Sequence, residues 1–131
     1  MQALVVFEDR VDSHWLAWLR PGFRHCYCLM RAEKGWVAID PLLSGLHVRW
    51  LDLPDDFDLA EHYARQGRIV LTGSARVFPR RPASFRPITC VEIVKRVLGL
   101  VHVWAWTPHQ VHRVLLDLGW KPQEAIDVSQ K

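Results

Sequence analysis

With 131 residues, of which 50% are hydrophobic and 24% charged, the chain is long enough for one folded domain and too short for two. This composition excludes a disordered or collagen-like protein, and no apolar stretch approaches the roughly 18 residues that cross a bilayer, so we expect no membrane span. The formal net charge of +3 is too small to indicate a nucleic-acid partner by itself.

The N-terminal residues and the cysteine count bear on the compartment. Two acidic residues and an arginine lie within the first ten positions, where a secretory signal peptide would be apolar. The three cysteines, Cys26, Cys28 and Cys90, are an odd number and do not suit a disulfide framework. We therefore expect a cytoplasmic protein whose thiols are reduced.

Charge is distributed unevenly along the chain. An acidic run between Asp52 and Glu61 is followed by a basic run between Arg68 and Arg86. We interpret both runs as solvated surface, because neither aromatic residues alternating with basic ones nor a nucleic-acid-binding motif accompanies them. Nucleic-acid binding through Arg76 to Arg86 is kept as an alternative, and it would show strong dependence on salt.

The N-terminal third predicts β-strands. Residues 3–7 form a β-branched run typical of a strand, whereas residues 14–19 suit either a strand or one helical turn. Residues 23–31 and 36–40 are two further strands, joined by a turn at residues 32–35 that ends in glycine. A proline closes the second of these strands, and the pair predicts a hairpin.

The middle of the chain predicts one helix, one strand and one loop. Residues 55–66 form a helix that an aspartate caps and Gly67 stops, and residues 68–72 return as a strand. Residues 73–87 contain three prolines and form a long loop with room for one short strand.

The first of two well-marked C-terminal helices begins at a cysteine. The order Thr89-Cys90-Val91-Glu92 fits a capping box, in which the Thr89 hydroxyl accepts an N–H near Glu92 and the Glu92 carboxylate returns to the Thr89 N–H. This pattern places Cys90 at the first position of a helix that ends near Gly99.

A strand and a second helix follow. Residues 100–106 are predicted as a strand. The order Thr107-Pro108-His109-Gln110 repeats the helix-start signal, with proline at the first helical position, and the helix ends at Gly119. The last dozen residues carry no clear signal. The elements together predict a single α+β domain that spans residues 1–131.

Cys90 is the candidate nucleophile. A thiol at the first position of a helix lies beside unsatisfied backbone N–H groups and the positive end of the helix dipole, and both favour the thiolate. The alternative interpretation is a small hydrophobic side chain at a buried helix start.

The hairpin supplies a candidate base and an orienting carboxylate. With the turn in this place, Arg31 pairs with Trp36, and His25 lies diagonal to Asp40 on the same face. In this register Asp40 holds the imidazole while the other ring nitrogen deprotonates Cys90. A slip of one residue would move Asp40 to the opposite face.

The same alternation places Cys26 and Cys28 on the other face of the strand, where we interpret them as packing residues. A metal site built from these cysteines and His25 is not expected, because both point away from His25 and no second cysteine pair exists. The sequence predicts neither a metal site nor a cofactor.

These residues resemble a known group of enzymes. A strand histidine, then a polar residue on the next strand, then a helix-starting cysteine is similar to the order in circularly permuted papain-like proteins. That group includes permuted relatives of the NlpC-type cell-wall peptidases and the lecithin retinol acyltransferase family. The resemblance covers about residues 23–99, and two segments carry it: Phe23-Arg24-His25 and Cys90-Val91-Glu92-Ile93-Val94.

The resemblance implies a papain-like fold, with a small antiparallel sheet packed against the helix that carries the cysteine. It implies a cysteine hydrolase in which Cys90 is the nucleophile, His25 the base and Asp40 the orienting residue. Thr89 departs from the asparagine that usually precedes the cysteine in the acyltransferase branch, which favours hydrolysis of an amide or ester over lipid acyl transfer. The expected partner is a peptide, amide or acyl substrate.

A second class of function is a catalytically inactive papain-like module for binding or assembly. The stretches Pro87 to Gly99 and Trp106 to Pro108 together resemble small proteins of phage and prophage gene clusters, so such a module would belong to a phage particle. It predicts that the three candidate residues lie out of mutual reach, or that a bulky side chain fills the cleft. The sequence indicates no oligomeric state.

The other histidines and the tryptophans have ordinary interpretations. His109 and His112 lie one helical turn apart without the glutamate and third ligand of a zinc protease, so we expect a helix surface, and His102 is expected in the core. The seven tryptophans are expected mostly in the core, with one or two lining a substrate cleft. The oxyanion hole would use the Cys90 N–H and a second donor, with three candidates: Ser13, His14 and Trp15.

Overall fold

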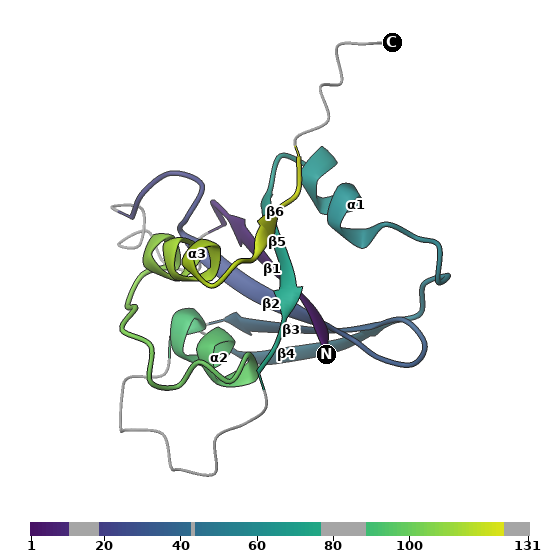
Figure 1. Ribbon diagram of the computed structural model, residues 1–131, viewed down its shortest axis with the longest axis horizontal. Coiled ribbons are helices and arrows are strands. Elements are labelled where there is room, and N and C mark those ends of the chain that lie inside the picture. The colour runs from purple at the N-terminus through teal and green to yellow at the C-terminus, as the bar shows by residue number, and fades with distance from the viewer. Residues whose placement is uncertain (11–18, 43, 77–88, 125–131) are drawn as a thin grey trace.

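A computed structural model describes residues 1–10, 19–42, 44–76 and 89–124 of the chain. Over these residues the protein is a mixed α/β structure with one antiparallel sheet of six strands in the order β4-β3-β2-β1-β5-β6, and three helices (Figure 1). The elements are β1 (Gln2–Glu8), β2 (His25–Arg31), β3 (Trp36–Leu42), β4 (Gly45–Leu51), α1 (Leu59–Arg65), β5 (Ile69–Ser74), α2 (Cys90–Val97), α3 (Pro108–Asp117) and β6 (Lys121–Pro122).

Strand β1 lies near the middle of the sheet, between β2 and β5. Its residues 3–7 are apolar without interruption, and both of its faces are buried. A continuous hydrophobic run is expected where a strand has packed side chains above and below it. The sheet is therefore covered on both sides at its centre.

Helices cover the two faces separately, as Figure 1 shows. One core cluster lies between the sheet and the pair α2 and α3, and it includes Val91, Val94 and Leu98. A second cluster lies between the opposite face and α1, around Leu59 and Tyr63. The helix that carries Cys90 thus packs on one side of the sheet only.

The hairpin register predicted from the sequence is correct. Arg31 pairs with Trp36 and Cys28 pairs with Ile39 across β2 and β3. The turn closes where Gly35 adopts a φ of 74°, which a residue without a Cβ tolerates best. Because α1 covers one face of this hairpin and α2 the other, a one-residue slip would move the side chains of one strand into the opposite core cluster and disrupt the packing of both clusters.

Helix α2 begins at Cys90 as predicted, but only half of the expected capping box is in place. The Thr89 hydroxyl accepts the Glu92 N–H at 3.3 Å. The Glu92 carboxylate, predicted to return to Thr89, instead accepts from Lys95 Nζ at 2.7 Å, and both charged side chains are buried. Lys95 also donates to the carbonyl oxygen of Ala105 at 3.3 Å, which ties α2 to the segment that follows it.

The other two helices are close to their predicted positions. Helix α3 has the complete capping box between Thr107 and Gln110. Helix α1 starts later than the predicted residue 55, because Asp58 rather than Asp55 caps it by accepting the Glu61 N–H. The chain leaves α1 at Gly67 with a positive φ of 80°, as the glycine signal predicted.

Two predictions about strands are wrong. Residues 100–106 form no strand: Leu100 N–H bonds to the end of α2, Val103 N–H bonds back to Leu100 across a turn at residues 101–102, and residues 103–106 are irregular. The predicted core histidine His102 is consequently exposed. Strand β4 was not predicted, and residues 73–74 belong to β5 rather than to the loop. Most of the predicted segments at 14–19 and 73–87 lie outside the described residues.

Within the described residues, no helix combines the length and apolar character that crossing a membrane requires.

Candidate active site

His25 and Asp40 meet at one end of the hairpin. His25 is the first residue of β2, Asp40 lies near the end of β3, and the two side chains are buried. His25 Nε2 lies 2.7 Å from Asp40 Oδ1. The bond occupies one ring nitrogen and leaves Nδ1 as the nitrogen that faces any other partner.

Asp40 is held from its other side by an arginine. Arg10, two residues beyond β1, donates to Asp40 Oδ2 at 2.7 Å and also lies 3.1 Å from Glu8 Oε1. Glu8 is buried beside His25 in the sheet and pairs with Arg68 at 3.0 Å. The carboxylate of Asp40 therefore has a partner on each oxygen, which fixes its orientation.

Cys90 reaches this pair from the opposite side of the sheet. Helix α2 places Cys90 against the core cluster that contains Cys26, and the thiol interacts there with the His25 side chain and with Cys26. His25 faces the other way along the strand, toward Tyr27, with ring centroids 6.1 Å apart.

The thiol of Cys90 is strongly acidified. The hydrogen bond from the Cys26 side chain is the largest influence, burial opposes it, and bonds from His25 and from the Cys26 backbone N–H add to it, so that the pKa of Cys90 falls to about 5. The start of α2 adds the positive end of the helix dipole. With this pKa, Cys90 is a thiolate at neutral pH.

The pKa values of His25 and Asp40 are shifted as well, and both shifts favour the charged forms of these side chains. Burial lowers the pKa of His25, but hydrogen bonds to Asp40 and Cys90 outweigh it and raise the pKa to about 9. Burial raises the pKa of Asp40, and bonds from His25 and Arg10 outweigh it and lower the pKa to about 2. The resting arrangement is thiolate, imidazolium and carboxylate.

The structure assigns Cys26 a contact that the sequence interpretation as packing missed. Cys26 is fully buried in the core cluster, as expected, but its thiol and its backbone N–H both donate to the Cys90 sulfur. The prediction that Cys26 points away from His25 was sound, yet Cys90 lies at the strand end where both faces are within reach. The only sequence signal was the adjacency of Cys26 to His25. Cys28 lies deeper in the same cluster.

The remaining residues predicted from the sequence lie away from the triad of Cys90, His25 and Asp40, or outside the described residues. Of the five tryptophans that the structure describes, Trp36 and Trp120 are buried, whereas the other three are exposed, which corrects the expectation of a mostly core role. His109 and His112 lie on α3, where both rings contact Phe23. The three oxyanion-hole candidates lie outside the described residues: Ser13, His14 and Trp15.

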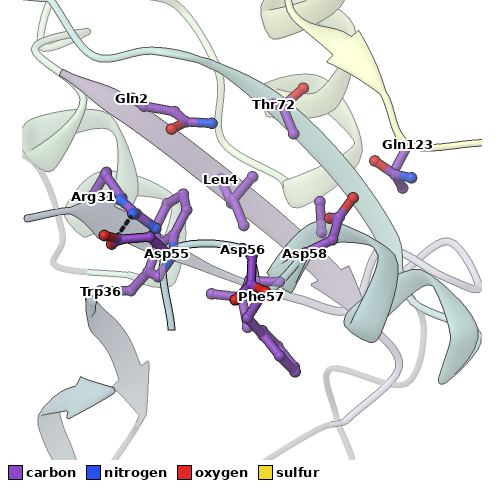
Figure 2. Close-up of a pocket in the computed structure, with 12 residues that line it drawn as sticks. Gln2, Leu4, Arg31, Trp36, Asp55, Asp56, Phe57, Asp58, Thr72 and Gln123 are labelled. Carbon is purple, nitrogen blue, oxygen red and sulfur yellow. Dashed lines mark hydrogen bonds and ion pairs between the residues drawn. The ribbon is translucent and has the colours of Figure 1, made fainter. Parts of the chain in front are cut away.

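A hollow of about 460 Å³ opens on the α1 side of the sheet (Figure 2). Its lining includes Leu4, Trp36 and the ion pair between Arg31 and Asp55, which Figure 2 marks. None of the three triad residues lines it. The chemistry of the thiolate identifies the candidate site more securely than the presence of this open, polar hollow.

Among the residues that the structure describes, no cluster of three or more histidine, cysteine, aspartate or glutamate side chains is arranged to hold a metal ion. Comparison with protein-family models, with curated proteins and with solved structures finds no match to this chain.

Proposed function

We propose that the protein is a cysteine hydrolase, a peptidase or amidase, that acts through Cys90, His25 and Asp40. The observation that supports this most directly is the continuous chain of contacts in which Asp40 holds His25 Nε2 at 2.7 Å and His25 bonds to a thiolate at a helix start. A nucleophile, a base and a group that orients the base are the three parts that nucleophilic catalysis by a thiol requires.

The proposed reaction has two halves. The Cys90 thiolate attacks the substrate carbonyl carbon, and the backbone N–H of Cys90 at the helix start donates to the oxygen that becomes negative. His25 passes its proton to the leaving amine or alcohol, which leaves an acyl thioester on Cys90. Neutral His25 then takes a proton from water, and the resulting hydroxide releases the acid and the free thiolate. Asp40 keeps the imidazole oriented throughout.

We further propose that this domain is a permuted papain-like fold related to the NlpC-type group. The order of histidine, acid and cysteine along the chain supports the proposal, as does the antiparallel sheet with the cysteine-bearing helix packed against it. Peptides, isopeptides, cell-wall stem peptides and acyl esters all present the carbonyl that the reaction needs.

A model ester tests the proposal without knowledge of the natural substrate. We expect p-nitrophenyl acetate to give a burst of nitrophenolate together with a mass gain of about 42 Da on Cys90, which is the acyl-enzyme. Cys90→Ala should abolish both signals while its circular dichroism spectrum stays that of the wild type. His25→Ala should slow the burst, because the imidazolium that stabilises the thiolate is lost.

Cys28→Ser is the matched control, since Cys28 is a buried cysteine of β2 and Cys90 is not among its partners. It should retain the burst. An acetyl group mapped to another residue, or equal rates in the wild type and His25→Ala, would refute the hydrolase.

The alternative, an inactive binding module, predicts a different arrangement of the three residues. It requires the three residues to lie apart or the cleft to be filled, whereas Cys90 is hydrogen-bonded to His25 and keeps part of its surface exposed. These contacts favour the hydrolase over the module.

A further inference from the structure

We infer that Cys26 and Cys90 form a reversible disulfide when the protein meets a peroxide, so that Cys26 is the resolving cysteine of a redox-sensitive site. The inference rests on the proposed function only for its consequence, which is that the disulfide would block the proposed nucleophile. The chemistry itself needs only the two thiols and the oxidant.

The first observation is the contact between the two sulfurs. Cys90, at the first position of α2, packs against the cluster that contains Cys26 of β2, and the Cys26 thiol donates a hydrogen bond to the Cys90 sulfur. Helix α2 lies directly on β2 and β3. Cys26 and Cys90 therefore lie in one packed cluster between β2 and α2, where an S–S bond of about 2.05 Å can form by a local movement of the two side chains.

The second observation is the difference in exposure and charge between the two cysteines. Cys90 is partly exposed and is acidified by its neighbours, so it is the thiolate that a peroxide oxidises first. Cys26 is completely buried, and its hydrogen bond to Cys90 together with burial raises its pKa. The two thiols therefore have separate roles: the peroxide oxidises the partly exposed Cys90, whereas the buried Cys26 is protected from the peroxide.

The reaction balances with hydrogen peroxide as the oxidant. The Cys90 thiolate attacks one peroxide oxygen, the O–O bond breaks, and the products are a sulfenic acid and hydroxide, which takes up one proton. The Cys26 sulfur then attacks the Cys90 sulfur, the S–O bond breaks, and the Cys26 proton leaves with the hydroxyl as water. The net change is oxidation of two thiols to one disulfide and reduction of one peroxide to two waters.

Cys26, rather than Cys28, has this role because Cys26 is the cysteine of β2 that interacts with Cys90. Cys28 lies on the same face of β2 and is equally buried, but burial alone dominates its raised pKa of about 12, and Cys90 is not among its partners. Cys28 therefore serves as an internal control for a buried cysteine that cannot resolve the sulfenic acid.

The test uses the full chain, reduced, desalted and treated with hydrogen peroxide near neutral pH, then denatured and labelled with N-ethylmaleimide. In the wild type we expect a mass loss of about 2 Da before labelling, one labelled thiol at Cys28, and a linked peptide that joins Cys26 to Cys90. Dithiothreitol should restore all three thiols. The Cys28→Ser variant should behave as the wild type.

In Cys26→Ser we expect Cys90 to gain about 32 Da as sulfinic acid, which dithiothreitol does not reverse. Cys26→Ala provides the same test if serine disturbs the core, and circular dichroism identifies a variant that has unfolded. Sulfinic acid at Cys90 of the wild type, a Cys26–Cys28 bond, or a disulfide between two chains on a non-reducing gel would each overturn the inference.

The outcome is separable from that of the hydrolase proposal. A disulfide without ester turnover would leave the redox inference standing and refute the hydrolase, whereas turnover without a disulfide would do the reverse. Turnover that disappears on peroxide treatment and returns with dithiothreitol in the wild type, but does not return in Cys26→Ser, would support both.

Discussion

Two adjacent residues of β2 acidify Cys90. His25 bonds to it from the start of β2, and the thiol and backbone N–H of Cys26 bond to it from the next position of the same strand. A helix N-terminus lowers a thiol pKa modestly, and neighbouring donors extend the effect. The acidity of Cys90 is therefore a property of its neighbours more than of its position in α2.

This acidity predicts the pH dependence of Cys90 alkylation. With a pKa of about 5, the rate of reaction with iodoacetamide should rise with an inflection near pH 5, whereas free cysteine titrates near about 8.5. The intrinsic nucleophilicity of a thiolate falls with its pKa, so the position of the inflection, and not the height of the plateau, is the quantity to measure. Stopped-time alkylation followed by peptide mass analysis gives it.

His25→Ala should move that inflection to higher pH, because the imidazolium favours the thiolate. It should remain below the value of free cysteine, since the donors of Cys26 are still present. An inflection of the wild type at the free-cysteine value would contradict the contacts around the sulfur.

Arg10 should stabilise the folded protein through Asp40. The lowered Asp40 pKa of about 2 means that its contribution to stability is present above the unfolded pKa, near about 4, and is lost as pH falls through about 2. Arg10 is about half exposed, so we expect Arg10→Gln to reduce the free energy of unfolding at pH 6 by about 1 kcal/mol or less. Urea titrations over a pH series measure this difference.

The difference in the free energy of unfolding between Arg10→Gln and wild type should narrow as the pH falls from about 4 through 2, because protonation of Asp40 removes the charge that Arg10 binds. Arg65→Gln is the matched control, since Arg65 pairs with Glu61 on the exposed side of α1. A constant difference at all pH values would place the effect of Arg10 outside its bond to Asp40.

At the scale of elements, features set by neighbouring residues, such as turns and helix starts, could be predicted from the sequence. Contacts between elements far apart in the chain could not. The register that brings His25 to Asp40 follows from one short turn, and the start of α2 follows from the residues around Thr89. The Cys26 contact could not be predicted, because it depends on where α2 packs against β2. Strand β4 was missed although its residues alternate, since strand formation there depends on pairing with β3.

The buried pair of Glu92 and Lys95 joins α2 to the chain that follows it. Removing one partner leaves an uncompensated charge in the core, so we expect Lys95→Ala to reduce the free energy of unfolding by about 3–5 kcal/mol. The double variant Glu92→Leu with Lys95→Met should recover most of that loss, because it removes both charges and keeps their volume. Thermal and urea unfolding monitored by circular dichroism measure both.

Lys34→Ala is the control for these variants, because Lys34 is exposed in the β2–β3 turn and should change stability by less than about 0.5 kcal/mol. A loss of similar size in Lys95→Ala and in the double variant would show that the pair contributes through packing and not through charge.

At the scale of the whole molecule, the sheet has one exposed apolar edge. Strand β4 lies at the edge of the sheet that the described residues form, and Leu46, Val48 and Trp50 alternate along it with more than half of each side chain exposed. Exposed apolar edge strands promote association between chains. Val48→Lys should therefore reduce concentration-dependent light scattering, whereas Arg49→Lys, on the other face of β4, should not.

If Val48→Lys scatters light as the wild type does, association does not use this edge. Analytical centrifugation of the wild type and both variants at several concentrations measures how strongly each of them associates.

The sequence was sufficient for the mixed α/β class but not for the order of the strands. The pairing of β1 with β5 joins segments far apart in the chain, and the closure of such pairs depends on the packing of the whole core. Trp120 shows the same dependence, because its indole covers Gly73, where a Cβ would lie 2.2 Å from the ring. Neither residue carries a sequence signal for the other.

The candidate site is assembled from parts that come together at different stages. His25 and Asp40 lie 15 positions apart within one hairpin, so their bond can form while the rest of the sheet is still unpaired. Cys90 joins them only when α2 docks on β2, because the residues that acidify it lie on that strand. An unfolded chain therefore presents an ordinary thiol, and the appearance of a reactive one marks completion of the fold. A thiol-specific dye near pH 6 would follow that last step in real time.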